Sequence, residues 1–289
     1  MFNFILQFTI ETLNQVLNIQ QMLRVMKEIY DNNIQFKLLN SDEDLKIEVN
    51  TVTVIDYLIK ILGSDKYGYA FDQGILSAVD FGAPQKRQRF FFMGVKKSIC
   101  EKVQLPKPIF DKEHYRTVRD AIADLEDVKP IEDITKDYGI SLVELNNLGE
   151  LADNLRDTDV LRNHIITSTR QTSMERFKTI KQGENFHSLP EDLKTNTYTD
   201  ISRTQNTIYL RLAYDEPSGT VVNVRKSMWI HPTLDRAVSI REAARLQTFP
   251  DSFVFAGTKD EQYQQVGNAV PPILARAIAS KLKEMLDNE

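Results

Sequence analysis

The sequence of 289 residues contains only one cysteine, Cys100, along with four histidines and one tryptophan. A single cysteine excludes an internal disulfide framework and a cysteine-rich metal site, and it fits a reducing compartment, so we expect a cytoplasmic protein without a metal. No apolar run approaches membrane-spanning length, so no membrane partner is expected. The apolar opening, MFNFILQF, lacks the cationic start of a secretory signal, which predicts a helix or strand meant for burial.

Acidic residues outnumber basic ones, 41 to 36, but basic residues predominate in two segments. The net charge of −5 argues against nucleic-acid binding through the whole surface. Residues 111–159 carry fourteen acids and six bases, whereas residues 162–181 carry five bases and one acid, and residues 225–245 five bases and two acids. Such basic islands suit a localised nucleic-acid footprint, although solvated surface charge would give the same pattern.

The first hundred residues contain few strand patterns. Apolar spacing predicts helical structure over residues 1–35 and a second helix at Thr53–Leu62 that Gly63 ends, with NSDEDLK after Leu39 as a loop. The runs YAFDQGILSAVDFG and RFFFMGV predict two strands around a Gly-Ala-Pro turn, and no other strand is expected before Tyr69. Two strands alone make a poor fold, so the rest of the sheet must come from elsewhere in this chain or from another chain.

The second half alternates between helical and irregular patterns. An acidic helical stretch is expected after Phe110, and the polar residues 163–223 predict a loop-rich recognition module. Ser239 and Glu242 have the spacing of a capping box, so a short helix should begin there. A last helix is expected after Pro271 and Pro272. Its predicted apolar face comprises Leu274, Ile278, Leu282 and Met285.

The stretch GAPQKRQRFFFMG places cations at the start of an apolar strand. In an extended chain Gln85, Arg87 and Arg89 share one face, with neighbours roughly 6.5 to 7 Å apart. One interpretation is an edge strand whose outer end carries solvated charge. The other is a rigid row of donors presented to an anionic or base-edge partner.

Three stretches in order, DFGAPQKRQR, RAVSIREAARLQTFPDSFVFAG and YQQVGNAVPPILARAIA, resemble the C-terminal half of bacterial DNA (cytosine-5) methyltransferases. Gln85, Arg87 and Arg89 resemble the family's eighth motif. Arg241–Pro250 resembles its ninth motif and Gly267–Pro272 its tenth. The resemblance covers about residue 68 to the C-terminus. It implies an α/β fold, with part of a Rossmann-like S-adenosylmethionine-dependent methyltransferase sheet and a smaller, loop-rich target recognition domain.

The resemblance also implies roles and boundaries. Arg89 would contact a cytosine flipped out of double-stranded DNA, and Gln85 and Arg87 would help to hold the base pocket and adjacent DNA. The implied cofactor is S-adenosylmethionine, whose site would be supplied in part by Gly267, Asn268, Ala269 and Val270. The implied structural residues of the ninth motif are Arg241, Glu242, Arg245 and Gln247. The implied segments are a partial catalytic domain at 1–98, the recognition domain with the ninth motif at 99–258, and the tenth motif with the last helix at 259–289.

The family's reacting groups have no counterpart in this sequence. Its nucleophile is the cysteine of a Pro-Cys pair, and a Glu-Asn-Val motif assists at the ring nitrogen. Cys100 follows Ile99 and matches no such position, and IEVN, residues 47–50, has the right letters in the wrong order and predicts strand or loop. No two of the eleven glycines form the Gly-x-Gly of the family's first motif.

Three interpretations therefore remain for the whole chain. It could be one subunit of a split restriction-modification methyltransferase, inactive alone, whose partner brings the Pro-Cys and Glu-Asn-Val motifs. It could instead be a truncated, inactive remnant, or a non-enzymatic DNA-binding protein that retains the recognition domain. The intact polar motifs favour the first, because a decaying chain loses polar functional residues that do not hold the fold.

Overall fold

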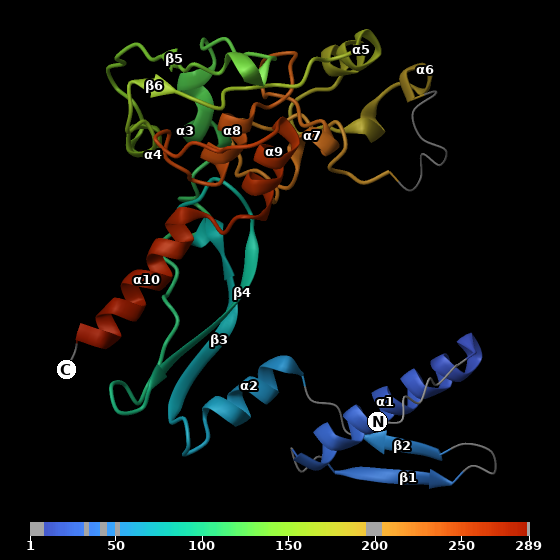
Figure 1. Cartoon of the computed structure of the whole chain (residues 1–289). Helices are drawn as coiled ribbons and strands as arrows, with labels where there is room; N and C mark the ends of the chain where they lie inside the picture. The colour runs from blue at the N-terminus through green and yellow to red at the C-terminus, as the bar shows by residue number, and fades with distance from the viewer. Residues whose placement is uncertain (1–8, 32–34, 41–44, 50–52, 195–203, 288–289) are drawn as a thin grey trace, which may run out of the picture. The chain divides into compact units, whose positions relative to one another are not determined.

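The computed structural model describes residues 9–31, 35–40, 45–49, 53–194 and 204–287. The chain divides into two compact units, Met1–Gly68 and Tyr69–Glu289 (Figure 1). The apolar opening, which was expected to be buried, lies outside the described residues. No helix among the described residues is long and apolar enough to cross a membrane.

The first unit consists of two helices and a hairpin, namely α1 (Ile10–Asp31), β1 (Phe36–Asn40), β2 (Leu45–Val49) and α2 (Val54–Leu62). The second helix ends at Leu62 as predicted and begins one residue later than predicted, at Val54, because Thr53 is its N-cap. Its Thr53 hydroxyl accepts a hydrogen bond from the Asp56 amide, and Gly63 closes the last turn. The first helix leaves most of its apolar side chains exposed, including Leu17 and Leu23.

The hairpin corrects the prediction of no strand before Tyr69. Of the loop predicted at residues 40–46, the two ends belong to β1 and β2, and residues 41–44 lie outside the described residues. The strands β1 and β2 pair antiparallel, with Leu38 opposite Ile47. Residues 45–49 read Leu-Lys-Ile-Glu-Val, a strict alternation of apolar and charged residues that suits a strand with one covered face. The alternation is only five residues long and follows a run of charged residues, which is why the sequence pattern predicted a loop there. The strand-or-loop prediction for IEVN is confirmed as strand for Ile47–Val49.

The second unit begins with the predicted pair of strands. The strands β3 (Tyr69–Ser77) and β4 (Gln88–Lys96) pair antiparallel, and the short 3-10 helix η1 (Ala78–Phe81) leads into the turn between them. Gly82 ends η1 with a φ of 93°, a left-handed conformation that favours glycine. The last helix, α10 (Pro272–Asp287), lies along the hairpin and packs Leu274 against Ala78 and Phe81 (Figure 1). Its predicted apolar face is therefore confirmed.

The rest of the second unit is a loop-rich body with short elements. These are α3 (Val118–Ile122), η2 (Ala123–Leu125), η3 (Ile134–Lys136), β5 (Ile140–Ser141), α4 (Glu150–Leu155), β6 (Val160–Leu161), α5 (Gln171–Thr179), η4 (Phe186–Ser188), α6 (Glu191–Lys194), α7 (Val224–Ser227), α8 (Ile240–Leu246) and α9 (Lys259–Asn268). One core surrounds the fully buried Trp229 and includes α3, α8 and α9. A second core gathers Phe177, Phe186 and Tyr209.

The acidic stretch after Phe110 is mostly irregular, whereas a helical stretch was expected. Several of its carboxylates bind nearby backbone amides instead of lining a helix face. Asp111 accepts from the Glu113 amide and Asp133 from the Thr135 amide. Local bonds of this kind compete with helix formation and favour turns.

Candidate functional site

The eighth-motif run keeps the predicted alternation. Gln85 and Arg87 are fully buried, Lys86 and Gln88 are exposed, and Arg89 is half-buried. The two buried side chains are therefore held inside the second unit, and only Arg89 of the three is accessible on their face.

Gln85, three residues before β4, joins the approach to this strand to the end of the ninth-motif helix α8 (Ile240–Leu246). Its Nε2 donates to the Leu246 carbonyl at 2.9 Å and to Gln247 Oε1 at 2.8 Å, and its Oε1 accepts from the Val221 amide at 3.1 Å. Gln247 in turn donates to the Val266 carbonyl in α9 at 2.8 Å. The side-chain amides of Gln85 and Gln247 therefore both find hydrogen-bond partners within the protein.

Arg87 joins the same strand to the tenth motif. It donates to the Val221 carbonyl at 2.7 Å and to the Gly267 carbonyl at 2.8 Å. Its Nε is buried without a partner among the described residues, and no described carboxylate pairs with it. Burial, with a smaller contribution from Arg89, lowers the pKa of Arg87 to about 10. We call Gln85, Arg87, Val221, Gln247 and Gly267 the motif joint.

The backbone around the motif joint is paired as well. The Lys86 amide donates to the Ser218 carbonyl at 2.8 Å, and the Ser218 amide donates to the Pro84 carbonyl at 2.9 Å. The Thr220 hydroxyl donates to the Lys86 carbonyl at 2.9 Å. The segment 218–221 is thus fixed beside the start of the eighth-motif strand.

Arg89 lies just beyond this joint and is held differently. Its Nη1 donates to the carbonyl of its neighbour Gln88 at 2.8 Å, and no ion pair involves it in the described part of the chain. Cys100 lies past the other end of β4 and donates from Sγ to the Lys102 carbonyl at 3.3 Å. Because the strand rises about 3.3 Å per residue, roughly 20 Å of strand separates Arg89 from the end nearest Cys100.

The tenth-motif residues divide into a buried glycine and exposed neighbours. A Cβ at Gly267 would lie 2.8 Å from the Val222 carbonyl carbon and 3.0 Å from the Asn223 nitrogen, so glycine is needed for this close backbone approach. Asn268 is exposed, and its Oδ1 accepts from Gln264 Nε2 at 2.8 Å. Val270 is exposed too, and Ala269, which caps α9, is partly so.

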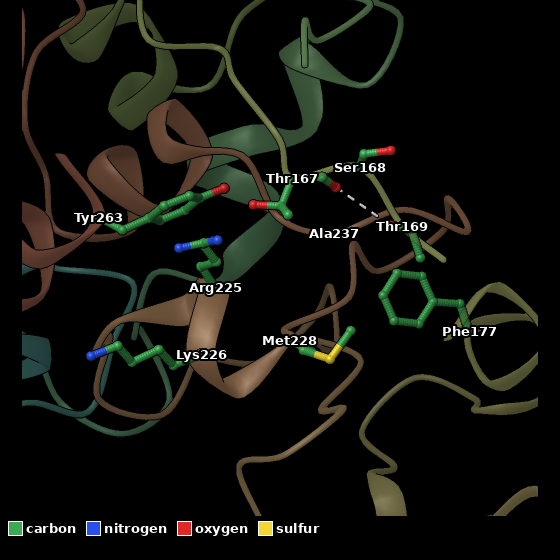
Figure 2. A pocket seen from close by; sticks show the side chains of 9 residues that line it. All are labelled: Thr167, Ser168, Thr169, Phe177, Arg225, Lys226, Met228, Ala237 and Tyr263. Atoms are coloured by element: carbon green, nitrogen blue, oxygen red, sulfur yellow. Dashed lines mark hydrogen bonds between the residues drawn. The ribbon is translucent and has the colours of Figure 1, made fainter. Parts of the chain in front are cut away.

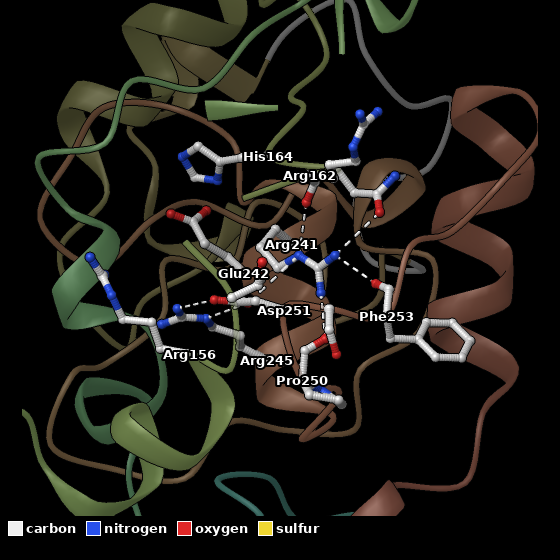
Figure 3. Close-up of polar contacts among 12 residues, drawn as sticks. Arg156, Arg162, His164, Arg241, Glu242, Arg245, Pro250, Asp251 and Phe253 are labelled. Carbon is white, nitrogen blue, oxygen red and sulfur yellow. Dashed lines mark hydrogen bonds and ion pairs between the residues drawn. The ribbon is translucent and has the colours of Figure 1, made fainter. Parts of the chain in front are cut away.

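The ninth-motif helix α8 is buried along its whole length, including Arg241, Glu242 and Arg245 (Figure 3). Arg241 donates to the carbonyls of Arg162, Pro250 and Phe253 at 2.9, 3.0 and 2.7 Å. It thereby ties the segment that follows β6 to the loop between α8 and α9.

Arg245 and Glu242 are charge-paired inside the core. Arg245 donates to both carboxylate oxygens of Asp251 at 2.9 and 2.5 Å and to Asp124 at 2.5 Å. Glu242 accepts two bonds from Arg236, at 2.8 and 2.6 Å, and one from the Ser239 amide in the predicted capping box. These bonds hold the pKa of Glu242 far below its usual range despite its burial.

Sequence reasoning missed the partners of these charges. Asp251 follows the motif directly and could have been found from the spacing of six residues to Arg245, but Asp124 is distant in the sequence and carries no motif. Asn163 was used only as a segment boundary, yet its amide bonds the Phe255 carbonyl at 2.9 Å and Gln262 Oε1 at 3.0 Å. No cluster of potential metal ligands occurs in the described ranges.

Acidification should destabilise this core through His231. Burial lowers the pKa of His231 to about 4, and His231 Nδ1 accepts amide bonds from Thr233 and Leu234 that need the neutral ring. The unfolded chain takes up this proton near pH 6.5, so the stability is present above that pH and lost below it. Between pH 6.5 and 4.5 we expect the free energy of unfolding to fall by about 2 to 3 kcal/mol from His231.

Denaturant unfolding at several pH values measures this loss. His231→Gln should reduce the slope of unfolding free energy against pH, whereas His187→Gln, at an exposed histidine, should leave it unchanged. An equal slope in the His231 variant and the unaltered chain would contradict the assignment.

The family model described as C-5 cytosine-specific DNA methylase matches residues 27–284 of this chain. Type II methyltransferase M.DdeI of Desulfomicrobium norvegicum is 30% identical over 237 residues, which cover 76% of this chain and 56% of that protein. Type II methyltransferase M1.HphI of Haemophilus parahaemolyticus is 33% identical over 225 residues, which cover 78% of this chain and 51% of that protein. The chain thus spans about half the length of these relatives.

One solved structure has a similar fold, a crystal structure described as a DNA modification methyltransferase encoded within a prophage (E. coli). It matches with a TM-score of 0.61 and 27% sequence identity, over 79% of this chain and 64% of that chain. The α/β class with part of a Rossmann-like methyltransferase sheet, which the sequence predicted, is thereby confirmed, and the sheets of the described residues are small and two-stranded.

Proposed function

Because the chain belongs to the C-5 cytosine-specific DNA methylase family, we propose that it supplies the DNA-recognising and cofactor-completing half of such an enzyme. The complete enzyme would transfer a methyl group to C5 of a cytosine flipped out of double-stranded DNA. The names of the Type II relatives favour a role in restriction-modification. The functional segments would be the partial catalytic domain at 1–98, the recognition domain at 99–258 and the tenth motif at 259–289.

The observation that carries this proposal is the motif joint. It brings the eighth, ninth and tenth motifs together through buried hydrogen bonds while leaving Arg89 accessible. A receptor for a flipped base needs this combination, because the donor must be held rigidly and still face the ligand. In this arrangement Gln85 and Arg87 act by positioning the strand, and Arg89 contacts the base.

Arg89 would donate its guanidinium bonds to the flipped ring. Attack on a cytosine ring places negative charge on the ring atoms, and a planar fork fixed in advance stabilises that charge. Among the described residues no carboxylate pairs with Arg89, so no ion pair has to be broken before Arg89 binds the ring. Its contribution should therefore grow as the charge develops.

Part of an S-adenosylmethionine site fits the tenth motif. Asn268, the last residue of α9, and Val270, which follows the helix, are exposed, so an amide and an apolar group are available to hold the ligand. Gly267 and Ala269 fit less directly, because the backbone of 222–223 covers Gly267. When bound, S-adenosylmethionine supplies the methyl group. These residues would complete one wall of its site and a complementary polypeptide would provide the rest.

Methyl transfer by the full chain tests the proposal. We expect no transfer from labelled S-adenosylmethionine to a cytosine-containing duplex by the chain alone, because no residue matches the nucleophile. Adding a polypeptide that carries the Pro-Cys and Glu-Asn-Val motifs should give transfer, and Cys100→Ala should not change either result.

Other outcomes identify the alternatives. Transfer by the chain alone that Cys100→Ala abolishes would make Cys100 the nucleophile and end the proposal of a split enzyme. Duplex binding without transfer in any mixture would favour a non-enzymatic DNA-binding protein. Neither binding nor transfer would favour an inactive remnant.

A further inference from the structure

Two adjoining hollows lie on the loop-rich body and share the residues Ser168, Thr169 and Met228. Their volumes are about 380 and 530 Å³. Figure 2 shows the first hollow, with the loop 167–169 on one side and Arg225, Lys226 and Met228, from α7 and its C-cap, on the other. We call the two hollows together the loop groove.

The loop side of the groove presents hydroxyl groups. Ser168 is exposed and Thr169 is partly so, and the Thr169 hydroxyl donates to the Thr167 carbonyl, which holds the loop. The Thr167 hydroxyl oxygen is buried and has no partner among the described residues. Serine and threonine hydroxyls both donate and accept, so they can bind the edge of any base.

The groove also offers two cations that have no carboxylate partner in the described part of the chain. These are Arg170 and Lys226, both exposed. Arg225 is paired with Asp260, and Arg176 is bound to the Leu193 carbonyl and the Tyr209 hydroxyl. In a chain of net charge −5, two unpaired cations beside a polar hollow favour an anion there.

Acidic side chains limit where that anion can lie. Glu175 and Asp192 line the second hollow together with Arg170. Asp260, the partner of Arg225, also interacts electrostatically with Lys226. A phosphate is therefore favoured only directly beside Arg170 and Lys226. Between the cations the hydroxyl groups and the Met228 side chain remain for an uncharged group. Phosphates flanking a base edge match this order of charged and neutral surface.

The groove is fixed relative to Arg89 through the motif joint. Arg87 bonds the Val221 carbonyl, the backbone of 222–223 packs on Gly267, and the Asn223 side chain caps α7 by accepting from the Lys226 amide at 3.3 Å. A surface that reads DNA must be held at a fixed distance from the residue that receives the target base. The buried hydrogen bonds of the motif joint fix the distance between the loop groove and Arg89.

We propose that the loop groove contacts the DNA beside the target cytosine. Arg170 and Lys226 bind backbone phosphates, and Ser168 and Thr169 read a base edge above Met228. This rests on the proposed function, since it names the DNA-reading surface of that same enzyme.

The experiment measures binding of the full chain to duplexes selected from a library with a randomised centre. Arg170→Ala combined with Lys226→Ala should weaken binding at least about tenfold and flatten its salt dependence by about two counterions. Lys178→Ala removes an exposed charge on α5 outside the groove and should change neither. Ser168→Ala combined with Thr169→Val should weaken binding to the selected sequence about three- to tenfold but leave unrelated duplexes unaffected. All replaced side chains are exposed or partly so, and unchanged melting temperatures verify folding.

Each outcome is decisive. Groove variants that bind like the unaltered chain would overturn the groove and leave the proposed function standing, as would an equal loss in the Lys178 variant. A loss of salt dependence with unchanged sequence preference would overturn the base contact. An unaltered chain that binds no duplex, alone or with the complementary polypeptide, would overturn the proposed function itself.

Discussion

Arg245→Met is expected to lower the free energy of unfolding of the full chain by about 3 to 5 kcal/mol. Arg245 is fully buried and binds two carboxylates, Asp124 and Asp251, which are themselves almost completely buried. Methionine fills a similar length but makes no ion pair, so Asp124 keeps only Arg156, at 3.0 Å, and Asp251 keeps only Arg241, at 3.8 Å. The cost is that of buried carboxylates whose charge is no longer fully compensated, and it exceeds the net contribution of the pairs themselves.

Chemical denaturation measures this change, and Arg119→Met is the matched control. Arg119 also pairs with an aspartate, Asp215, but on the surface, so its removal should cost about 0 to 1 kcal/mol. Arg245→Lys should recover only part of the loss, because one ammonium cannot replace a fork that spans two carboxylates. Equal losses at Arg245 and Arg119 would show that the ninth-motif charges do not brace the module.

Arg89→Ala is expected to lower the turnover of an active complex with the complementary polypeptide about a hundredfold, equivalent to about 3 kcal/mol. Duplex affinity should change much less, because the contact strengthens only as charge develops on the ring. Arg89→Lys should not restore the rate fully, since a point charge lacks the planar fork. Turnover at saturating DNA and affinity at two salt concentrations separate the two effects.

Lys86→Ala is the control for charge alone. Lys86 is exposed on the opposite face of the same run, so its loss should at most weaken affinity and flatten the salt dependence by about one counterion. If Arg89→Ala behaves in the same way and keeps its rate at saturating DNA, Arg89 is a backbone clamp and not a contact to the reacting base.

Sequence patterns correctly predicted those helices and strands that depend on neighbouring residues, such as helix caps and apolar spacing. The capping box of Ser239 and Glu242 set the start of α8, and the proline pair and the four-residue spacing set α10. The alternation in the eighth-motif run predicted which side chains share a face. Where short polar segments competed, local patterns failed, as in the hairpin of β1 and β2 and in the irregular acidic stretch.

The sequence by itself determined the family, the missing reacting groups and the row formed by Gln85, Arg87 and Arg89. It could not separate their environments, because all three are polar and lie on one face. The tertiary structure decided that Gln85 and Arg87 are buried and Arg89 is accessible, since Val221, Gln247 and Gly267 come from segments more than 130 residues away. The burial of a polar side chain depends on which backbone carbonyls, distant in the sequence, can accept its hydrogen bonds. The spacing of residues along the chain does not show which carbonyls these are.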